Sequence, residues 1–329
     1  MTELNDWLVG VTGITDIDLR PASSDASFRR YFRVQLGDAT RIVMDAPPPQ
    51  EDCRPFVEIA GFLQEMGLNG PEILHADLER GFLLISDLGQ RQYLDELSAN
   101  PASADRLYED AIRALTTLHS KGADFHSKLP DYGEALLGFE MSLFHDWLCE
   151  RHLGLKFSAD DERQWTECCQ IVVRSALAQP AVFVHRDYHS RNLMLAAQSN
   201  PGILDFQDAV VGPLTYDLVS LLKDCYIRWP AERVRAWAMD FHAALDPEAK
   251  MGLGSASFLR CFHLMGVQRH LKAAGIFARL LHRDGKPGYM KDVPRTLQYI
   301  VDVGRQYPEI QFLATLIEER CLPALEGQT

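Results

Sequence analysis

The chain has 329 residues, 47% of them hydrophobic, which is enough to bury a core and to form two lobes. Its net charge of −13 argues against nucleic acid as a partner, because binding to phosphate backbones requires clustered excess cations. The acidic N-terminus, the lack of a long apolar run and seven scattered cysteines predict a cytoplasmic protein with reduced thiols, without a secretory signal or a membrane partner.

The first ninety residues have the pattern of a small antiparallel sheet with one helix. Short β-branched or alternating runs, separated by turn residues, predict strands at 17–20, 31–36, 41–46 and 81–85. Between the third and fourth strands, apolar residues recur at helical spacing from position 54 to 66. Glycines at 67 and 70 end that helix.

Beyond this part of the chain, helical patterns dominate. Apolar residues at intervals of three and four predict helices at 104–120, 143–152, 161–178 and 257–283. The sequence contains no internal repeat and no low-complexity tract. The overall pattern predicts an α+β fold, with a small sheet-containing part followed by a larger helical part.

The most specific motif is His-Arg-Asp-Tyr-His-Ser-Arg-Asn, which ends at Asn192. Phosphoryl transfer requires a carboxylate near the attacking hydroxyl and oxygen ligands that hold Mg²⁺ against the nucleotide phosphates. Asp187 is the candidate catalytic base, and Asn192 and Asp205 are the candidate metal ligands. Two short apolar strands, at 192–195 and 202–204, predict a hairpin that returns Asp205 to Asn192.

This motif and the downstream run Gly-Pro-Leu-Thr-Tyr-Asp-Leu at 212–218 resemble the aminoglycoside phosphotransferase and choline kinase superfamily. The segments at 26–34 and 43–48 are similar to bacterial kinases of cell-wall amino sugars. The resemblance implies a two-lobed protein-kinase-like fold, with a nucleotide-binding lobe at 1–88 and a catalytic and substrate-binding lobe at 89–329. It also implies ATP and Mg²⁺ as cofactors, and phosphorylation of the anomeric hydroxyl of N-acetylmuramate and N-acetylglucosamine in peptidoglycan recycling.

The same resemblance implies where the nucleotide binds. Backbone groups of Ser86 and Leu88, in the hinge between the lobes, would bond to the adenine edge. The turn that ends at Ser27 would cover the phosphates. This turn contains no glycine, but small hydroxylated residues can also expose backbone N–H groups to a phosphate.

One position departs from the kinase pattern. The third strand places Met44 where kinases carry the lysine that contacts the phosphates and pairs with a helix glutamate, here Glu58. We expect Arg30 or Arg33, on the neighbouring strand, to supply the missing cation. A shifted strand register and a pseudokinase that binds nucleotide without catalysis are the alternatives.

The acceptor is expected to be a small molecule. The segment between Asp205 and Asp217 is too short for the activation segment on which protein kinases bind peptides. Asp217 is predicted to cap the helix that follows and to hold the catalytic loop. The sequence does not determine the oligomeric state, and a monomer is compatible with it.

The long helix at 257–283 carries candidate acceptor-binding residues, namely Arg260, His263, Arg269 and Lys272. A positive pocket there would favour an amino sugar with a carboxylate. Aminoglycoside kinases, the competing enzyme class, would instead present carboxylates to a polycationic substrate.

Overall fold

The computed structural model describes residues 2–24 and 28–327. The chain separates into two compact units, one comprising Met1–Leu118 with Arg191–Ala209 and the other His119–Ser190 with Val210–Thr329. The boundary passes through helix α4 (Ala104–Gly122) and through the predicted catalytic loop. The predicted lobes, 1–88 and 89–329, remain a prediction.

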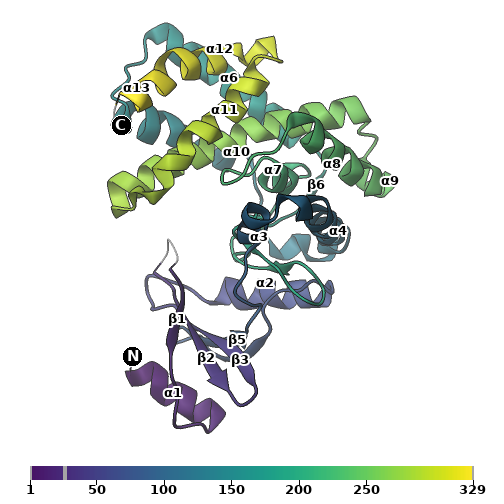
Figure 1. Cartoon of the computed structure of the whole chain (residues 1–329). Helices are drawn as coiled ribbons and strands as arrows, with labels where there is room; N and C mark the ends of the chain where they lie inside the picture. Colours follow the sequence, from purple (N-terminus) through teal and green to yellow (C-terminus); the bar gives the residue numbers. More distant parts are fainter. Residues whose placement is uncertain (1, 25–27, 328–329) are drawn as a thin grey trace. The chain divides into compact units, whose positions relative to one another are not determined.

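The first unit contains a five-stranded antiparallel sheet (Figure 1). The strand order is β1-β2-β3-β5-β4, with the bounds β1 Arg20–Ser24, β2 Arg30–Leu36, β3 Ala39–Asp45, β4 Ile73–Asp77 and β5 Phe82–Ser86. The strands predicted at 31–36, 41–46 and 81–85 are confirmed. The strand predicted at 17–20 lies later, as β1, and the sequence analysis did not predict β4.

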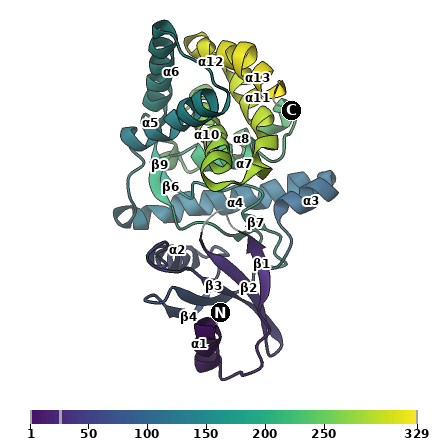
Figure 2. The same ribbon diagram turned by 90° about the vertical axis from the view of Figure 1, so that its left-hand side faces the viewer.

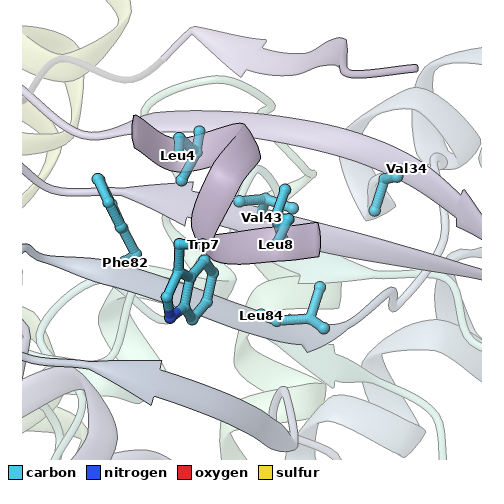
Figure 3. Packing of buried hydrophobic residues seen from close by; sticks show 7 residues of the cluster. All are labelled: Leu4, Trp7, Leu8, Val34, Val43, Phe82 and Leu84. Carbon is cyan, nitrogen blue, oxygen red and sulfur yellow. The ribbon is translucent and has the colours of Figure 1, made fainter. Parts of the chain in front are cut away.

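Two helices lie on opposite sides of this sheet, α1 (Thr2–Thr12) and α2 (Arg54–Glu65) (Figure 2). The second confirms the predicted helix, whereas α1 was not predicted. Side chains of α1 and of three strands form a buried cluster, namely Leu4, Trp7, Leu8, Val34, Val43, Phe82 and Leu84 (Figure 3). The spacing of the three α1 residues puts them on one side of the helix, a signal present in the sequence.

The predicted hairpin is confirmed in the same unit. Strands β7 (Leu193–Met194) and β8 (Gly202–Ile203) pair antiparallel, with Leu193 opposite Ile203. The backbone N–H of Leu204 then donates to the carbonyl of Asn192 at 2.9 Å. This pairing brings Asp205 back to Asn192. Helix α3 (Tyr93–Ala99) and the first part of α4 complete the unit.

The second unit is mainly helical and is built around α10 (Ser255–Asp284), which packs against α5, α6, α7 and α11 (Figure 2). Its other elements are α5 Glu134–Leu143, a π-helical segment Phe144–His152, α6 Ala159–Leu177, β6 Ala181–Val184, β9 Val210–Pro213, α7 Tyr216–Leu222, α8 Ala231–Ala244, α9 Pro247–Lys250, α11 Val293–Gly304, α12 Gln311–Leu316 and α13 Leu322–Glu326. The helices predicted at 104–120, 143–152, 161–178 and 257–283 are confirmed to within a few residues.

Two further sequence expectations concern the whole chain. All seven cysteines lie in the described residues and are free thiols, as predicted. In residues 2–24 and 28–327, no helix combines the length and the apolar character that crossing a bilayer requires.

Candidate active site

The start of the catalytic loop is held by Asp217. One oxygen of its carboxylate accepts the backbone N–H of His185 at 2.6 Å, and the other accepts that of Arg186 at 3.0 Å. Burial raises the pKa of Asp217 to about 7, although these two N–H groups act in the opposite direction. The predicted helix cap is wrong, because α7 begins at Tyr216 with Thr215 as its cap residue. Asp217 thus bonds to the loop and not to its own helix terminus.

Asp187 lies two residues further along in a positively charged environment. Its side chain is 42% exposed, and the Nε2 atom of His189 lies 4.0 Å from its Oδ1 atom. Burial raises the pKa of Asp187, but the positive charges of Lys272, His189 and Arg269 outweigh this effect and hold the pKa below its usual value. The carboxylate is therefore ionised at neutral pH and can accept a proton or a hydrogen bond.

A buried glutamate that was not predicted from the sequence pairs with two cations near this loop. Glu140, on α5, is 3% exposed and forms ion pairs with Arg186 and with Lys272, whose Nζ atom lies 2.9 Å from its Oε1 atom. Tyr132 and Gln268 also donate to this carboxylate. The signal in the sequence is a glutamate among the apolar residues of the second half of α5, because a carboxylate that is buried with such neighbours must find a partner.

The four residues predicted on α10 do not form one pocket. Arg260 and Lys272 are twelve positions apart on a continuous helix, which corresponds to roughly 18 Å along its axis. Arg260 pairs with Glu309 at 2.6 Å, and His263 accepts or donates a hydrogen bond at Tyr307. The physical reason is the length of this helix, which separates Arg260 and His263 from Arg269 and Lys272 along its axis.

The other pair on α10 is buried beside the catalytic loop. Arg269 is 5% exposed and donates to the hydroxyl of Ser220, and Lys272 is 8% exposed and donates to the hydroxyl of Tyr216 at 2.9 Å. Both act on Asp187 through their charge. Their position supports an electrostatic role at the loop.

The predicted metal ligands lie together in the first unit. The Nδ2 atom of Asn192 donates to Oδ2 of Asp205 at 3.1 Å, and the amide of Gln207 donates to Oδ1 at 2.9 Å. Asp205 has a φ of +63°, an uncommon value for a residue with a side chain. A carboxylate and an amide oxygen are the donors that Mg²⁺ prefers, so this pair fits the implied ion.

The two predicted arginines of β2 lie on opposite faces of the sheet. Because side chains alternate along a strand, Arg30 shares the face of Val34 that α1 covers, and it forms an ion pair with Asp45. Arg33 lies on the other face and binds both oxygens of Asp87, at 2.6 and 3.0 Å. It also donates to the carbonyl of Gly89 at 2.9 Å. Arg33 therefore braces the segment that follows β5, and Arg30 lies away from the face of Met44.

The other residues predicted to bind the nucleotide lie at separate places in the chain and have different neighbours. The backbone N–H of Ser86 donates to the carbonyl of Glu72, and the hydroxyl of Ser86 accepts the N–H of Glu72, at 2.9 Å each. The backbone of Leu88 forms no hydrogen bond with the backbone of another described residue. Glu58 is exposed and forms no ion pair within the described ranges. Ser27 lies outside the described residues.

Comparison with solved structures shows the fold. A choline kinase from Streptococcus pneumoniae matches with a TM-score of 0.63 and 11% identity, covering 91% of this chain and 99% of that chain. An ADP-bound aminoglycoside phosphotransferase matches with a TM-score of 0.62 and 16% identity, covering 92% and 98%. The predicted α+β kinase-like fold is confirmed.

Comparison of sequences identifies the family. The chain is 51% identical to a protein of Pseudomonas aeruginosa named N-acetylmuramate/N-acetylglucosamine kinase, over 96% of this chain and 95% of that protein. Residues 18–253 match the family described as the phosphotransferase enzyme family, and this range includes Asp187, Asn192 and Asp205. The predicted resemblance is confirmed, and the chain belongs to the phosphotransferase enzyme family.

Proposed function

We propose that this chain is an ATP- and Mg²⁺-dependent kinase that phosphorylates the anomeric hydroxyl of N-acetylmuramate and N-acetylglucosamine. The observation that carries the proposal is the 51% identity, over nearly the whole chain, with a protein named for these two sugars. The presence of Asp187, Asn192 and Asp205 supports a catalytically competent kinase and argues against a pseudokinase.

Asp187 is the proposed catalytic base. Its ionised and partly exposed carboxylate would accept the proton of the sugar hydroxyl as the sugar oxygen bonds to the γ-phosphorus. The bond between that phosphorus and the bridging oxygen breaks, and ADP leaves. The hydrogen bonds from the loop to Asp217 position Asp187 for this step.

Asn192 and Asp205 would hold Mg²⁺, which when bound neutralises charge on the nucleotide phosphates. The carbonyl of Ser86 and the N–H of Leu88 would bond to the adenine edge, one as acceptor and the other as donor. An aminoglycoside phosphotransferase with the same fold binds ADP, which supports nucleotide binding by this fold.

The charges around Asp187 support an acceptor that is neutral or acidic. Arg269 and Lys272 are buried beside the loop and act on Asp187. A polycationic aminoglycoside would meet like charge there, and repulsion of the wrong substrate contributes to specificity. N-acetylmuramate carries a lactyl carboxylate and would be attracted to the same region.

The test is turnover of purified protein with Mg·ATP and each acceptor, with the product identified by phosphorus NMR. Both amino sugars should give a sugar 1-phosphate, whose phosphorus couples to the anomeric proton. Kanamycin should be a poor substrate. Faster phosphorylation of kanamycin, a phosphate on another carbon, or ATP hydrolysis without transfer to either sugar would contradict the proposal.

A further inference from the structure

We propose that Arg29, held by Glu51, is the cation that binds the nucleotide phosphates in place of the third-strand lysine. The inference rests on the proposed kinase function and assigns a residue that the kinase pattern does not predict. It explains how a site with Met44 at the lysine position can still bind the phosphates.

In this chain, a buried methionine occupies the usual position of this cation. Met44 is 0% exposed, and its neighbours across the sheet are Tyr31 on β2 and Leu83 on β5. It lies on the sheet face opposite to Val43, which packs under α1. The face that should carry a phosphate-binding cation therefore carries a buried thioether at this strand position.

Arg29 and Glu51 form a buried ion pair in the same unit. The Nε atom of Arg29 lies 3.0 Å from Oε2 of Glu51, and both side chains are only 11% exposed. The other oxygen of Glu51 accepts the backbone N–H of Phe28 at 3.1 Å. Glu51 thus fixes both the guanidinium and the backbone beside it. This pair combines the same two charges as the lysine and glutamate pair of kinases, but both residues come from other segments of the chain.

One contact places the Arg29 side chain near the position of the missing lysine, and its charge also interacts with the proposed metal ligand. Its side chain is hydrogen-bonded to Tyr31, the residue directly opposite Met44 in the sheet. The carboxylate of Asp205 is close enough to act on Arg29 through its charge. If Asp205 holds the metal ion that binds the nucleotide phosphates, a guanidinium beside Tyr31 and within reach of the charge of Asp205 is suited to bind the same phosphates.

The neighbouring arginines are less suited to this role. Arg30 lies on the α1 face with Asp45, and Arg33 binds Asp87 and Gly89 at the hinge. The assignment also accounts for Glu58, which is exposed and forms no ion pair with a described residue, since Glu51 takes its place. The guanidinium carries several N–H donors and can hold a carboxylate and a phosphate oxygen at once.

The experiment is calorimetric binding of ADP and of adenosine to the full chain and to Arg29→Ala. Loss of a charge-assisted contact to a phosphate should weaken ADP binding by about ten- to a hundred-fold. Adenosine lacks phosphates, so its affinity should not change. Arg29→Lys should recover part of the ADP affinity, because it restores the charge without the planar geometry.

Arg54→Ala is the matched control, because Arg54 is an exposed arginine that pairs with Asp52 at 3.2 Å in the same unit. Its ADP and adenosine affinities should equal those of the wild type. Should Arg29→Ala fail to fold, Arg29→Gln removes the same charge while keeping most of the stem. Its expected result is the same selective loss of ADP affinity.

Unchanged ADP affinity in the folded charge-removing variant would overturn the assignment, and so would an equal loss for adenosine, which would indicate a packing effect. The two proposals can fail separately. If the wild type binds ADP but phosphorylates neither sugar, the sugar kinase proposal fails while the Arg29 result stands. If the wild type phosphorylates the sugars and the variant binds ADP normally, only the Arg29 proposal fails.

Discussion

The carboxylate of Asp217 accepts the backbone N–H of Arg186 at 3.0 Å. Arg186 has a φ of +76°, a conformation that costs a residue with a side chain about 1–3 kcal/mol. The ion pair between Arg186 and Glu140 adds a second restraint from α5. Two elements therefore hold the strained residue immediately before Asp187, which explains how the loop can keep its catalytic carboxylate in one position.

The first prediction concerns this restraint. In Asp217→Asn, the amide oxygen can accept one of the two loop N–H groups. The amide nitrogen is a donor and cannot accept the other N–H group, which loses its acceptor. A buried donor without an acceptor costs about 1–3 kcal/mol, so the free energy of unfolding should fall by that amount. The turnover number should also fall, because Asp187 loses its fixed position. Urea unfolding and steady-state kinetics measure the two effects.

Asp240→Asn, an exposed change on α8, is the control and should alter neither quantity. Wild-type stability together with wild-type turnover in Asp217→Asn would show that the loop does not depend on this carboxylate.

The second prediction concerns the metal ligands. Asp205→Ala removes a carboxylate that fits Mg²⁺ and also removes the partner of the Asn192 amide. Activity should be lost, and the affinity for Mg·ADP should fall more than the affinity for ADP in the presence of a chelator. Calorimetry with and without Mg²⁺ gives the comparison.

Asp6→Ala, which changes an exposed carboxylate on α1, controls for the change in net charge. An equal loss of affinity with and without Mg²⁺ in Asp205→Ala would remove Asp205 from metal binding.

The elements that were predicted correctly are those that depend on local spacing. The hairpin of β7 and β8 follows from two apolar runs and a polar turn, and it brings Asn192 and Asp205 within hydrogen-bonding distance of each other. The same holds for α2 and for the central strands, whose apolar periodicity reflects burial on one face or both.

The residues that were missed depend on contacts between distant segments. Glu140 meets Arg186 and Lys272 because α5 packs against α10, and no local pattern reports that packing. Arg29 and Glu51 are likewise brought together by the fold. The error on α10 has the same origin, since a list of polar residues on one helix does not state which of them face the same neighbour.

The third prediction concerns the catalytic base. Asp187→Asn keeps the size of the side chain but removes its ability to accept a proton. General-base assistance contributes roughly 10²–10⁴-fold to the rate, so the turnover number with either sugar should fall by that order. ADP affinity should stay near the wild-type value. A folded variant with full turnover would exclude Asp187 from the chemistry.

The last prediction links Lys272 to the pH dependence of the reaction. The positive charges around Asp187 hold its pKa below the usual value, against the effect of burial, so the wild-type carboxylate stays ionised well into the acidic range. Lys272→Gln removes the positive charge that has the strongest effect on Asp187, so it should raise the pKa of this carboxylate. The carboxylate would then gain a proton at a higher pH, and the acidic limb of the kcat/KM profile should shift to higher pH.

The variant needs a control for its structural effect, because Lys272 also pairs with Glu140. Circular dichroism should show a folded protein, since Arg186 still compensates the glutamate. Lys291→Gln removes an exposed lysine and should leave the profile unchanged. If Lys272→Gln lowers the rate equally at every pH, the lysine acts only through packing. A shift of the acidic limb toward lower pH would contradict the sign of the charge effect on Asp187.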